Sequence, residues 1–489
     1  MHVRHSEDGT VRRRSHASAR PRTNHAHPTL RVVRACHPAV ALALVLIGLA
    51  SIPLQAGEIG ASPLRLATFR CDVTPPLEGR FQGGWMQPLT TLEAPLWAKG
   101  IVLEDARGRY VLCAIDWCGL SNSSHGLFCR KLAEAAGTEV SRVALQCVHQ
   151  HTAPYVDGDA QVLLDKHPSP PRYADLKSLD ELSGRLAEAV RRAIGGLQPV
   201  DGIGTGEVRV ERIAATRRVP GPDGKVRVRW SSCTEPDLRA APEGNIDPML
   251  KTITLARGSK PLVRLHYYAT HPQSGGGDGR VGIDFVGDAR ERLERQEGVV
   301  QVYFTGCAGD VTAGKYNDGS AQARRELTAR LLAAMEAAIA STRLVPIRQL
   351  AWRTVPLRLP VRTDAGFTLA ENRAIVADAK SASGARIAAA SRVAFLERIA
   401  RPIELSVLEI GRVRIVHLPG EPMVEFQQYA RRLLPGHFVA VAGYGDGGPG
   451  YLCTEESFAH GGYEPTATMA APRGESVLKT AIEQLLAPR

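Results

Sequence analysis

The sequence of 489 residues has no internal repeat and few aromatic residues (5%), and no apolar run reaches the ~18 residues that a membrane-spanning helix requires. Its 44% hydrophobic and 23% charged residues are typical of an ordinary globular protein. The composition therefore excludes a fibre, a disordered chain and a membrane protein with several spans. No long polar linker divides the chain, so we expect residues 57–489 to form a single domain.

The chain also lacks a basic cluster beyond residue 56. The formal net charge is +11, but residues 1–56 contribute eight arginines and two acids. The remainder holds 53 basic and 48 acidic residues, a net charge of +5, which disfavours nucleic-acid binding. The segment from Gly309 to Lys315 spells GxxxxGK, but Tyr316 replaces the Ser or Thr that must bind magnesium, so we expect no nucleotide.

No two of the nine cysteines form a CxxC pair, and eight of them lie beyond residue 56. Their scattered spacing predicts neither a zinc knuckle nor a particular disulfide.

The first 56 residues have the pattern of a secretory signal. A basic stretch ends at Arg34, and an apolar run follows from Ala39 to Leu54. The run is short for an uncleaved membrane anchor, which is the weaker interpretation. We therefore expect a leader over residues 1–56, cleaved after Ala50 or Ala56, and a secreted or periplasmic protein.

Short β-like runs alternate with helical patterns, and several strand pairs are joined too tightly for crossover helices. The predicted fold class is α/β (mixed α+β), with mixed β-sheets covered by peripheral helices. The expected strands are 101–105, 110–116, 143–149, 207–214, 225–230, 249–256, 261–269, 299–304, 404–410 and 412–418. The expected helices are 124–136, 178–194, 320–342, 368–400, 423–434 and 475–487. A surface loop is expected over residues 155–177, and Ser178 and Glu181 have capping-box spacing.

Two histidines end the expected strand 143–149, in the sequence His149-Gln150-His151. The period of two residues in a strand places both imidazoles on one face, where they can hold a metal ion. The alternative is a pair of core histidines whose ring nitrogens bond to the backbone.

A further strand carries a histidine at its end, His271, directly before Pro272 and a glycine-rich loop. A single histidine in this position is more often structural. Its recurrence in the same context as His149 points to a shared site, because active sites collect where loops meet at strand ends.

Two turns add polar groups to these histidines. Residues 305–312 form a glycine-rich turn whose backbone N–H groups could hold an oxyanion. Glu421 stands at a strand-to-helix turn, where it is a candidate ligand or base, although an acid stabilised by the helix dipole explains it equally well. Two or three His and one Glu suggest a His₂Glu zinc site with a position left for water, as in hydrolytic zinc enzymes.

At these residues the chain resembles the catalytic domain of the neutral (neutral/alkaline, non-lysosomal) ceramidase family, in order from about residue 65 to 488. The matching motifs are CDVTPP (71–76), GGW (83–85), AKGIVLED (98–105), HQHTAP (149–154), ATHP (269–272), CAGDVTAG (307–314), PGEPMV (419–424) and GYLCTEESFAHGGYEPTAT (450–468). Their common order is more specific than any single motif.

The resemblance implies one catalytic Zn²⁺ ion and a site for the substrate amide. The implied zinc ligands are His149, His271, Glu421 and Tyr451. The implied amide-site residues are His151, Arg217 and Tyr463, with Arg218 as the neighbouring alternative to Arg217.

The chain departs from the family pattern at Thr312. The family has a serine there, described as a nucleophile, and threonine keeps the hydroxyl but adds a methyl group. We expect the Thr312 hydroxyl to orient substrate or complete a hydrogen-bond network. We also expect no C-terminal immunoglobulin-like domain.

The combined interpretation is an exported zinc amidohydrolase of sphingolipid metabolism that hydrolyses the N-acyl amide bond of ceramide or a related N-acyl lipid through a metal-bound water. Its partner would be that lipid, taken from a membrane surface. His151 is the candidate for proton transfer to the leaving amine, and Tyr463 for hydrogen bonding to the oxyanion. Two alternatives remain: a zinc hydrolase of the same fold acting on another amide or ester, and a binding protein without turnover.

Overall fold

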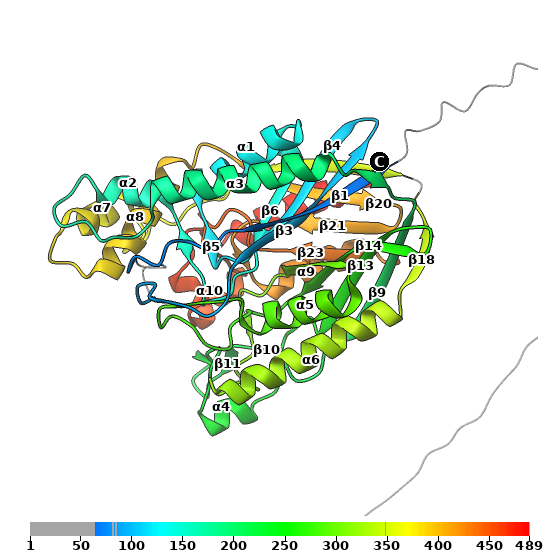
Figure 1. The fold of residues 1–489 in the computed structure, drawn as a ribbon. Helices are drawn as coiled ribbons and strands as arrows, with labels where there is room; N and C mark the ends of the chain where they lie inside the picture. Colours follow the sequence, from blue (N-terminus) through cyan, green and yellow to red (C-terminus); the bar gives the residue numbers. More distant parts are fainter. Residues whose placement is uncertain (1–63, 81–82, 84–85, 348, 489) are drawn as a thin grey trace, which may run out of the picture. The chain divides into compact units, whose positions relative to one another are not determined.

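The computed structural model describes residues 64–80, 83, 86–347 and 349–488, so the expected leader lies outside the described residues. Two five-stranded sheets and one four-stranded sheet form the framework of this part of the chain (Figure 1). The first sheet runs in the order β6 (Val143–Cys147), β4 (Gly108–Ile115), β3 (Trp97–Asp105), β1 (Arg65–Asp72) and β8 (Gln198–Pro199). The second runs in the order β16 (Val300–Thr305), β14 (Lys260–Tyr268), β13 (Met249–Arg257), β9 (Gly202–Arg209) and β18 (Arg343–Pro346). The third runs in the order β19 (Leu350–Leu357), β20 (Ile403–Ile410), β21 (Val413–His417) and β23 (Phe438–Ala442).

Each sheet contains the same unit: an antiparallel hairpin, a helix, and a strand parallel to the second hairpin strand. The three units are β3-β4-α1-β6, β13-β14-α5-β16 and β20-β21-α9-β23. Their helices are α1 (Asn122–Ala136), α5 (Asp284–Glu297) and α9 (Val424–Leu433). A parallel pair needs such a crossover, because its strands cannot be joined by a tight turn. The expected fold class, mixed sheets with peripheral helices, is confirmed.

Helices cover the outer faces of the sheets. Figure 1 shows α1 and α3 (Leu176–Ile194) along one side, and α5 and α6 (Ala321–Ala340) along the other. Helix α11 (Gly474–Leu486) packs on α9 and β19, while α2 (Gly158–Leu164), α7 (Leu369–Ala377) and α8 (Ser383–Glu397) form a group of their own.

The inner strands are buried on both faces, which accounts for their continuous apolar sequences. In β4, all six residues from Tyr110 to Ile115 are buried. Strand β16 contacts β3, β4 and β6 of the first sheet and β23 of the third. The carboxyl ends of the three parallel pairs therefore meet around β16, and the loops that follow them are held together there.

Backbone hydrogen bonds link these loops directly. The N–H of Cys147 donates to the carbonyl of Tyr444 at 2.7 Å, and the N–H of Gly443 donates to Thr305 at 2.9 Å. The Thr305 hydroxyl also donates to the carbonyl of Val148 at 2.6 Å. The ends of β6, β16 and β23, one strand from each sheet, are thus bonded to one another.

Three expected elements differ from the structure for physical reasons. The strand expected at 207–214 is β9 (Gly202–Arg209), which begins earlier because alternating glycines give its first half no apolar pattern. Glycine is required at Gly206, where a Cβ would lie 1.8 Å from the Ala338 carbonyl of α6. Helix α3 begins at Leu176 because the Asp175 carboxylate accepts from the N–H of Lys177, so Ser178 and Glu181 form no capping box. The loop expected at 155–177 contains α2, capped by Asp157.

Helix α5 was not expected, because its buried face carries charges among its apolar residues. Arg290 lies fully buried and binds both carboxylate oxygens of Asp116 at 2.7 and 2.8 Å. Glu291 accepts from the buried ammonium of Lys99 at 2.5 Å. These internal ion pairs interrupt the apolar stripe by which a helix is recognised in sequence.

All eight cysteines of the described residues are free thiols, seven of them buried. Within the same residues, no helix has both the length and the apolar character needed to cross a bilayer.

Candidate metal centre and catalytic cavity

Three residues that follow strands of the three main sheets meet at the junction of the parallel pairs. His149 follows β6, His271 follows β14, and Glu421 lies in β22 (Glu421–Pro422), which follows β21. The Nε2 atoms of the two histidines are 3.2 Å apart, and they lie 3.2 and 3.5 Å from Oε2 of Glu421. The exposed fractions of His149, His271 and Glu421 are only 1%, 1% and 7%.

Backbone carbonyls determine which nitrogen of each imidazole faces this junction. Nδ1 of His149 lies 2.5 Å from the Cys118 carbonyl, and Nδ1 of His271 lies 2.7 Å from the Ala308 carbonyl. A carbonyl oxygen can only accept, so both Nδ1 atoms carry the proton. Both Nε2 atoms therefore present lone pairs toward Glu421, which is the arrangement of metal-binding histidines with carbonyl partners.

The residues present fit a divalent metal ion. Oε2 of Glu421 is buried without a hydrogen-bond partner among the described residues. Two imidazole lone pairs and a carboxylate oxygen facing one another repel, and a shared cation would neutralise all three. Two nitrogens and one carboxylate oxygen are the donors that zinc accepts in hydrolytic sites.

The protonation states suit the same ion. Burial lowers the pKa of His271 to about 4, so its imidazole is neutral near neutral pH. Burial alone would raise the pKa of Glu421, but the two histidines outweigh it and hold that pKa well below its usual range. A neutral imidazole and an ionised carboxylate are the forms that bind metals.

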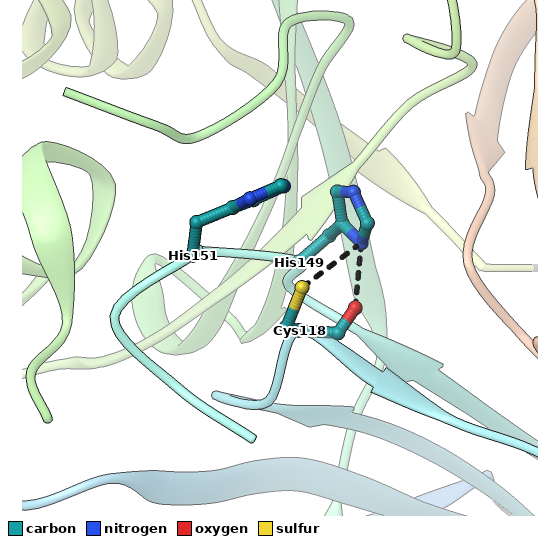
Figure 2. Close-up of side chains that lie close together, drawn as sticks. All are labelled: Cys118, His149 and His151. Carbon is teal, nitrogen blue, oxygen red and sulfur yellow. Dashed lines mark hydrogen bonds between the residues drawn. The ribbon is translucent and has the colours of Figure 1, made fainter. Parts of the chain in front are cut away.

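Cys118, His149 and His151 form a second group of potential ligands (Figure 2). The sulfur of Cys118 lies 3.9 Å from Nδ1 of His149, but that nitrogen already donates its proton to the Cys118 carbonyl. Burial also raises the pKa of the Cys118 thiol well above its usual value, which keeps the thiol protonated. The group of His149, His271 and Glu421 is therefore the better metal site.

A cavity of about 880 Å³ opens beside these residues. Of the sequence-predicted site residues, those that line it are His149, His151, Arg217, Glu421, Tyr451 and Tyr463. His271 is not part of the lining, but its Nε2 atom contacts that of His149, which is. The structure thus brings seven of the eight predicted residues together around one cavity.

Tyr451 reaches the cavity because its strand pairs with that of Glu421. Strand β24 (Tyr451–Leu452) is parallel to β22, and Tyr451 is the register partner of Glu421. The Arg217 guanidinium lies 5.0 Å from the Tyr451 ring centre. Burial raises the pKa of the Tyr451 hydroxyl, and the charge of Arg217 acts in the opposite direction.

His151 faces the two metal-site histidines, with ring centres 5.0 Å from His149 and 5.8 Å from His271. Its Nε2 is buried and has no hydrogen-bond partner among the described residues. Burial and then the two neighbouring histidines hold the pKa of His151 well below its usual value. A neutral imidazole with a free ring nitrogen at the cavity can accept or pass on a proton.

Thr312 is the predicted site residue that the structure does not bring to the cavity. It lies in β17 (Val311–Thr312), opposite Ala215 of β10 (Ala215–Thr216), and is fully buried. Its hydroxyl is 3.4 Å from the Arg229 carbonyl and accepts from the N–H of Gly314 at 3.3 Å. In this arrangement the hydroxyl bonds to backbone and supports the turn that follows.

Glu464 is a site residue that the sequence reasoning missed. Its carboxylate, completely buried, accepts from Nε of Arg217 at 2.7 Å and from Nη1 of Arg218 at 2.5 Å. Arg217 is thereby aimed at Tyr451 and Tyr463, while Arg218 turns away to the Ser457 carbonyl. The available signal was its position directly after Tyr463 in the matching segment 450–468.

Tyr444 is the second missed residue. Its ring stacks on that of His149 with centres 4.2 Å apart, and its hydroxyl is buried without a partner among the described residues. Both residues have positive φ angles, 74° for His149 and 62° for Tyr444. Such backbone strain at non-glycine residues clusters at functional sites. No local sequence pattern indicates it, so Tyr444 was not predicted.

The described chain has a ceramidase-like fold. The neutral ceramidase from Pseudomonas aeruginosa superimposes on it with a TM-score of 0.65 and 17% sequence identity, over 87% of this chain and 74% of that chain. A ceramidase complexed with C2 has a TM-score of 0.62 and 15% identity, over 86% of this chain and 74% of that chain. No protein-family model and no curated protein sequence matches this chain.

Proposed function

We propose that this protein is a zinc-dependent amidohydrolase that hydrolyses the N-acyl amide bond of ceramide or a related N-acyl lipid. The observation that carries the proposal is the meeting of His149, His271 and Glu421 beside a large cavity in a ceramidase-like fold. The structural neighbours support it, because both are ceramidases.

The residues around the cavity have distinct tasks in this proposal. A zinc ion held by His149, His271, Glu421 and Tyr451 would supply a Lewis acid and lower the pKa of a water molecule. His151, neutral and unpartnered, would pass a proton to the leaving amine. Tyr463, whose pKa burial raises, would keep its proton and donate a hydrogen bond to the acyl oxygen.

The remaining cavity wall suits an apolar chain. Helix α8 contributes Ala385, Ile387 and Ala388 to the lining, and Met469 belongs to the same lining. Trp230, half exposed at the cavity, packs edge-on against Tyr463 with ring centres 5.2 Å apart. A fatty acyl chain would remove these surfaces from water, at about 25 cal/mol for each Å² buried.

The direct test is release of fatty acid from a ceramide by the purified protein. We expect no release from protein stripped of metal and recovery when zinc is added back. Soluble amides and esters, assayed in parallel, distinguish an N-acyl lipid hydrolase from a hydrolase of other substrates. Stoichiometric zinc binding without turnover of any amide or ester would contradict the proposal and favour a binding protein.

The variant Tyr463→Phe is expected to keep its zinc and lose turnover. It removes one preorganised donor to a developing negative charge, a loss of about 3 kcal/mol or roughly 100-fold in kcat. Metal analysis and fatty-acid release measure the two properties separately. Tyr429→Phe, which alters an exposed hydroxyl bound to Glu483, is the control and should be fully active. Unchanged turnover in Tyr463→Phe would remove that residue from the mechanism.

We further propose that residues 57–489 form the mature hydrolase domain and that the protein is exported. The support is the basic and apolar pattern of residues 1–56. Intact-mass measurement of the protein recovered outside the cytoplasm should give an N-terminus after Ala50 or Ala56. Recovery of the chain in the cytoplasmic fraction with residues 1–56 still attached would contradict export.

A further inference from the structure

One face of helix α8 lines the catalytic cavity and carries a cation. The lining residues recur every three or four positions, at Gly384, Ala388 and Ser391, as expected for one side of a helix. Arg392 belongs to the same face and is the only basic residue on it. The side chain is half-buried, so its charge is only partly hydrated.

Arg392 has no carboxylate of the described residues within ion-pair distance. The two acids that line the cavity with Arg392 are engaged elsewhere: Asp157 accepts from Asn122 and caps α2, and Glu421 faces His149 and His271. Other acids are paired with other arginines, Asp446 with Arg398, Glu464 with Arg217 and Arg218, and Asp364 with Arg362. The structure records no hydrogen bond of the Arg392 guanidinium to other described residues either. An arginine that has lost water without gaining an anion is unusual, since buried charges are normally paired.

A second guanidinium lies beside Arg392. The Cζ atoms of Arg362 and Arg392 are 3.4 and 5.2 Å from the ring centre of Phe367. The cation–π contact holds Arg392 in place but supplies no negative charge. Burial, and then repulsion from Arg362, lower the pKa of Arg392, which is the response of a cation that lacks a counter-ion.

We propose that Arg392 binds an anionic group of the substrate, a carboxylate or a phosphate. This inference rests on the proposed function and narrows it. The fatty acyl half of an N-acyl lipid carries no charge, so the anionic group belongs to the amine half. The preferred substrates are then N-acyl lipids with an acidic head group, recognised by a guanidinium that matches oxyanions in shape and charge.

Binding of lipids without an amide bond in the chain tests this apart from turnover. The carboxylate pair is dodecyloxyacetate and 2-dodecyloxyethanol, and the phosphate pair is dodecyl phosphate and dodecanol. We expect the zinc-loaded protein to bind one or both anions about 10-fold or more tighter than their neutral counterparts. The pair with the larger difference identifies the oxyanion.

Variants assign the preference to one side chain. Arg392→Gln should bind each anion as weakly as its neutral counterpart, with affinity for the neutral lipids unchanged, and Arg392→Lys should keep part of the difference. Arg412→Gln removes the same charge from an exposed turn and should behave as the wild type. Equal affinity of the wild type for both members of each pair, or a preference that survives in Arg392→Gln, would overturn the inference.

Binding and hydrolysis, measured on the same purified protein, distinguish failure of this inference from failure of the proposed function. Hydrolysis of neutral ceramide without any anion preference overturns the role of Arg392 and leaves the amidohydrolase proposal standing. An Arg392-dependent anion preference without hydrolysis of any amide supports the anion site and overturns the amidohydrolase proposal.

Discussion

Replacing His271 by alanine is expected to remove bound zinc and fatty-acid release together. His271 supplies one of two imidazole lone pairs in the group with Glu421, and the Ala308 carbonyl holds its ring in the binding orientation. Loss of a residue that only orients a ligand costs about 10- to 100-fold in metal affinity or activity, so loss of the ligand itself should exceed 100-fold.

Two measurements on His271→Ala check this expectation. Metal analysis after dialysis should find about one zinc per chain in the wild type and none in the variant. Added zinc should raise the melting temperature of the metal-free wild type but not of the variant, since only a ligand that binds the folded state stabilises it. His460→Ala, at an exposed histidine, is the control and should match the wild type. A variant that keeps its zinc would exclude His271 as a ligand.

Replacing Glu464 by alanine is expected to lower the free energy of unfolding by about 3–5 kcal/mol. The carboxylate is fully buried and neutralises Arg217, which is itself buried, as well as the side chain of Arg218. Its removal leaves two guanidinium groups without a counter-ion, and desolvated charge is costly. The rate of amide hydrolysis should fall as well, because Arg217 would no longer be held against Tyr451 and Tyr463.

Denaturant unfolding at constant pH measures the effect of Glu464→Ala. The matched control is Glu397→Ala, which breaks the exposed ion pair with Arg373 at 2.8 Å. That pair is hydrated on both sides, so its loss should cost no more than about 1 kcal/mol. A cost for Glu464→Ala that is no larger than for Glu397→Ala would mean that the buried carboxylate does not support the site.

The secondary structure was predictable where local periodicity and burial agree. Helices α6 and α11 carry apolar residues on one face and lie within two residues of their expected bounds. Helix α5 and strand β9 escaped prediction because ion pairs in α5 and glycines in β9 interrupt the apolar pattern of their buried faces. In both cases part of the buried face makes contacts that the apolar periods of a sequence do not record.

The candidate site was likewise predictable from local patterns only where its residues stand at recognisable strand ends or turns. His149 and His271 were recognisable because each ends a strand, and Glu421 because it stands in a strand-to-helix turn. Tyr444 gave no such signal, since it acts by stacking on His149, and the only signal for Glu464 was its position next to Tyr463. Thr312 shows the opposite case: its motif resembles a catalytic one, but the residue bonds to the backbone away from the cavity.

The sequence by itself determined the alternation of strands and helices and the residue types at the strand ends, because both depend on periods of two and 3.6 residues along the chain. The tertiary structure alone decided that His149, His271 and Glu421 share one point, and that Arg392 faces the cavity without a counter-ion. The reason is that these positions depend on contacts between elements far apart in the sequence. The packing of the three parallel strand pairs around β16 brings the three ligands together, and the packing of α8 on α2 and α7 places Arg392.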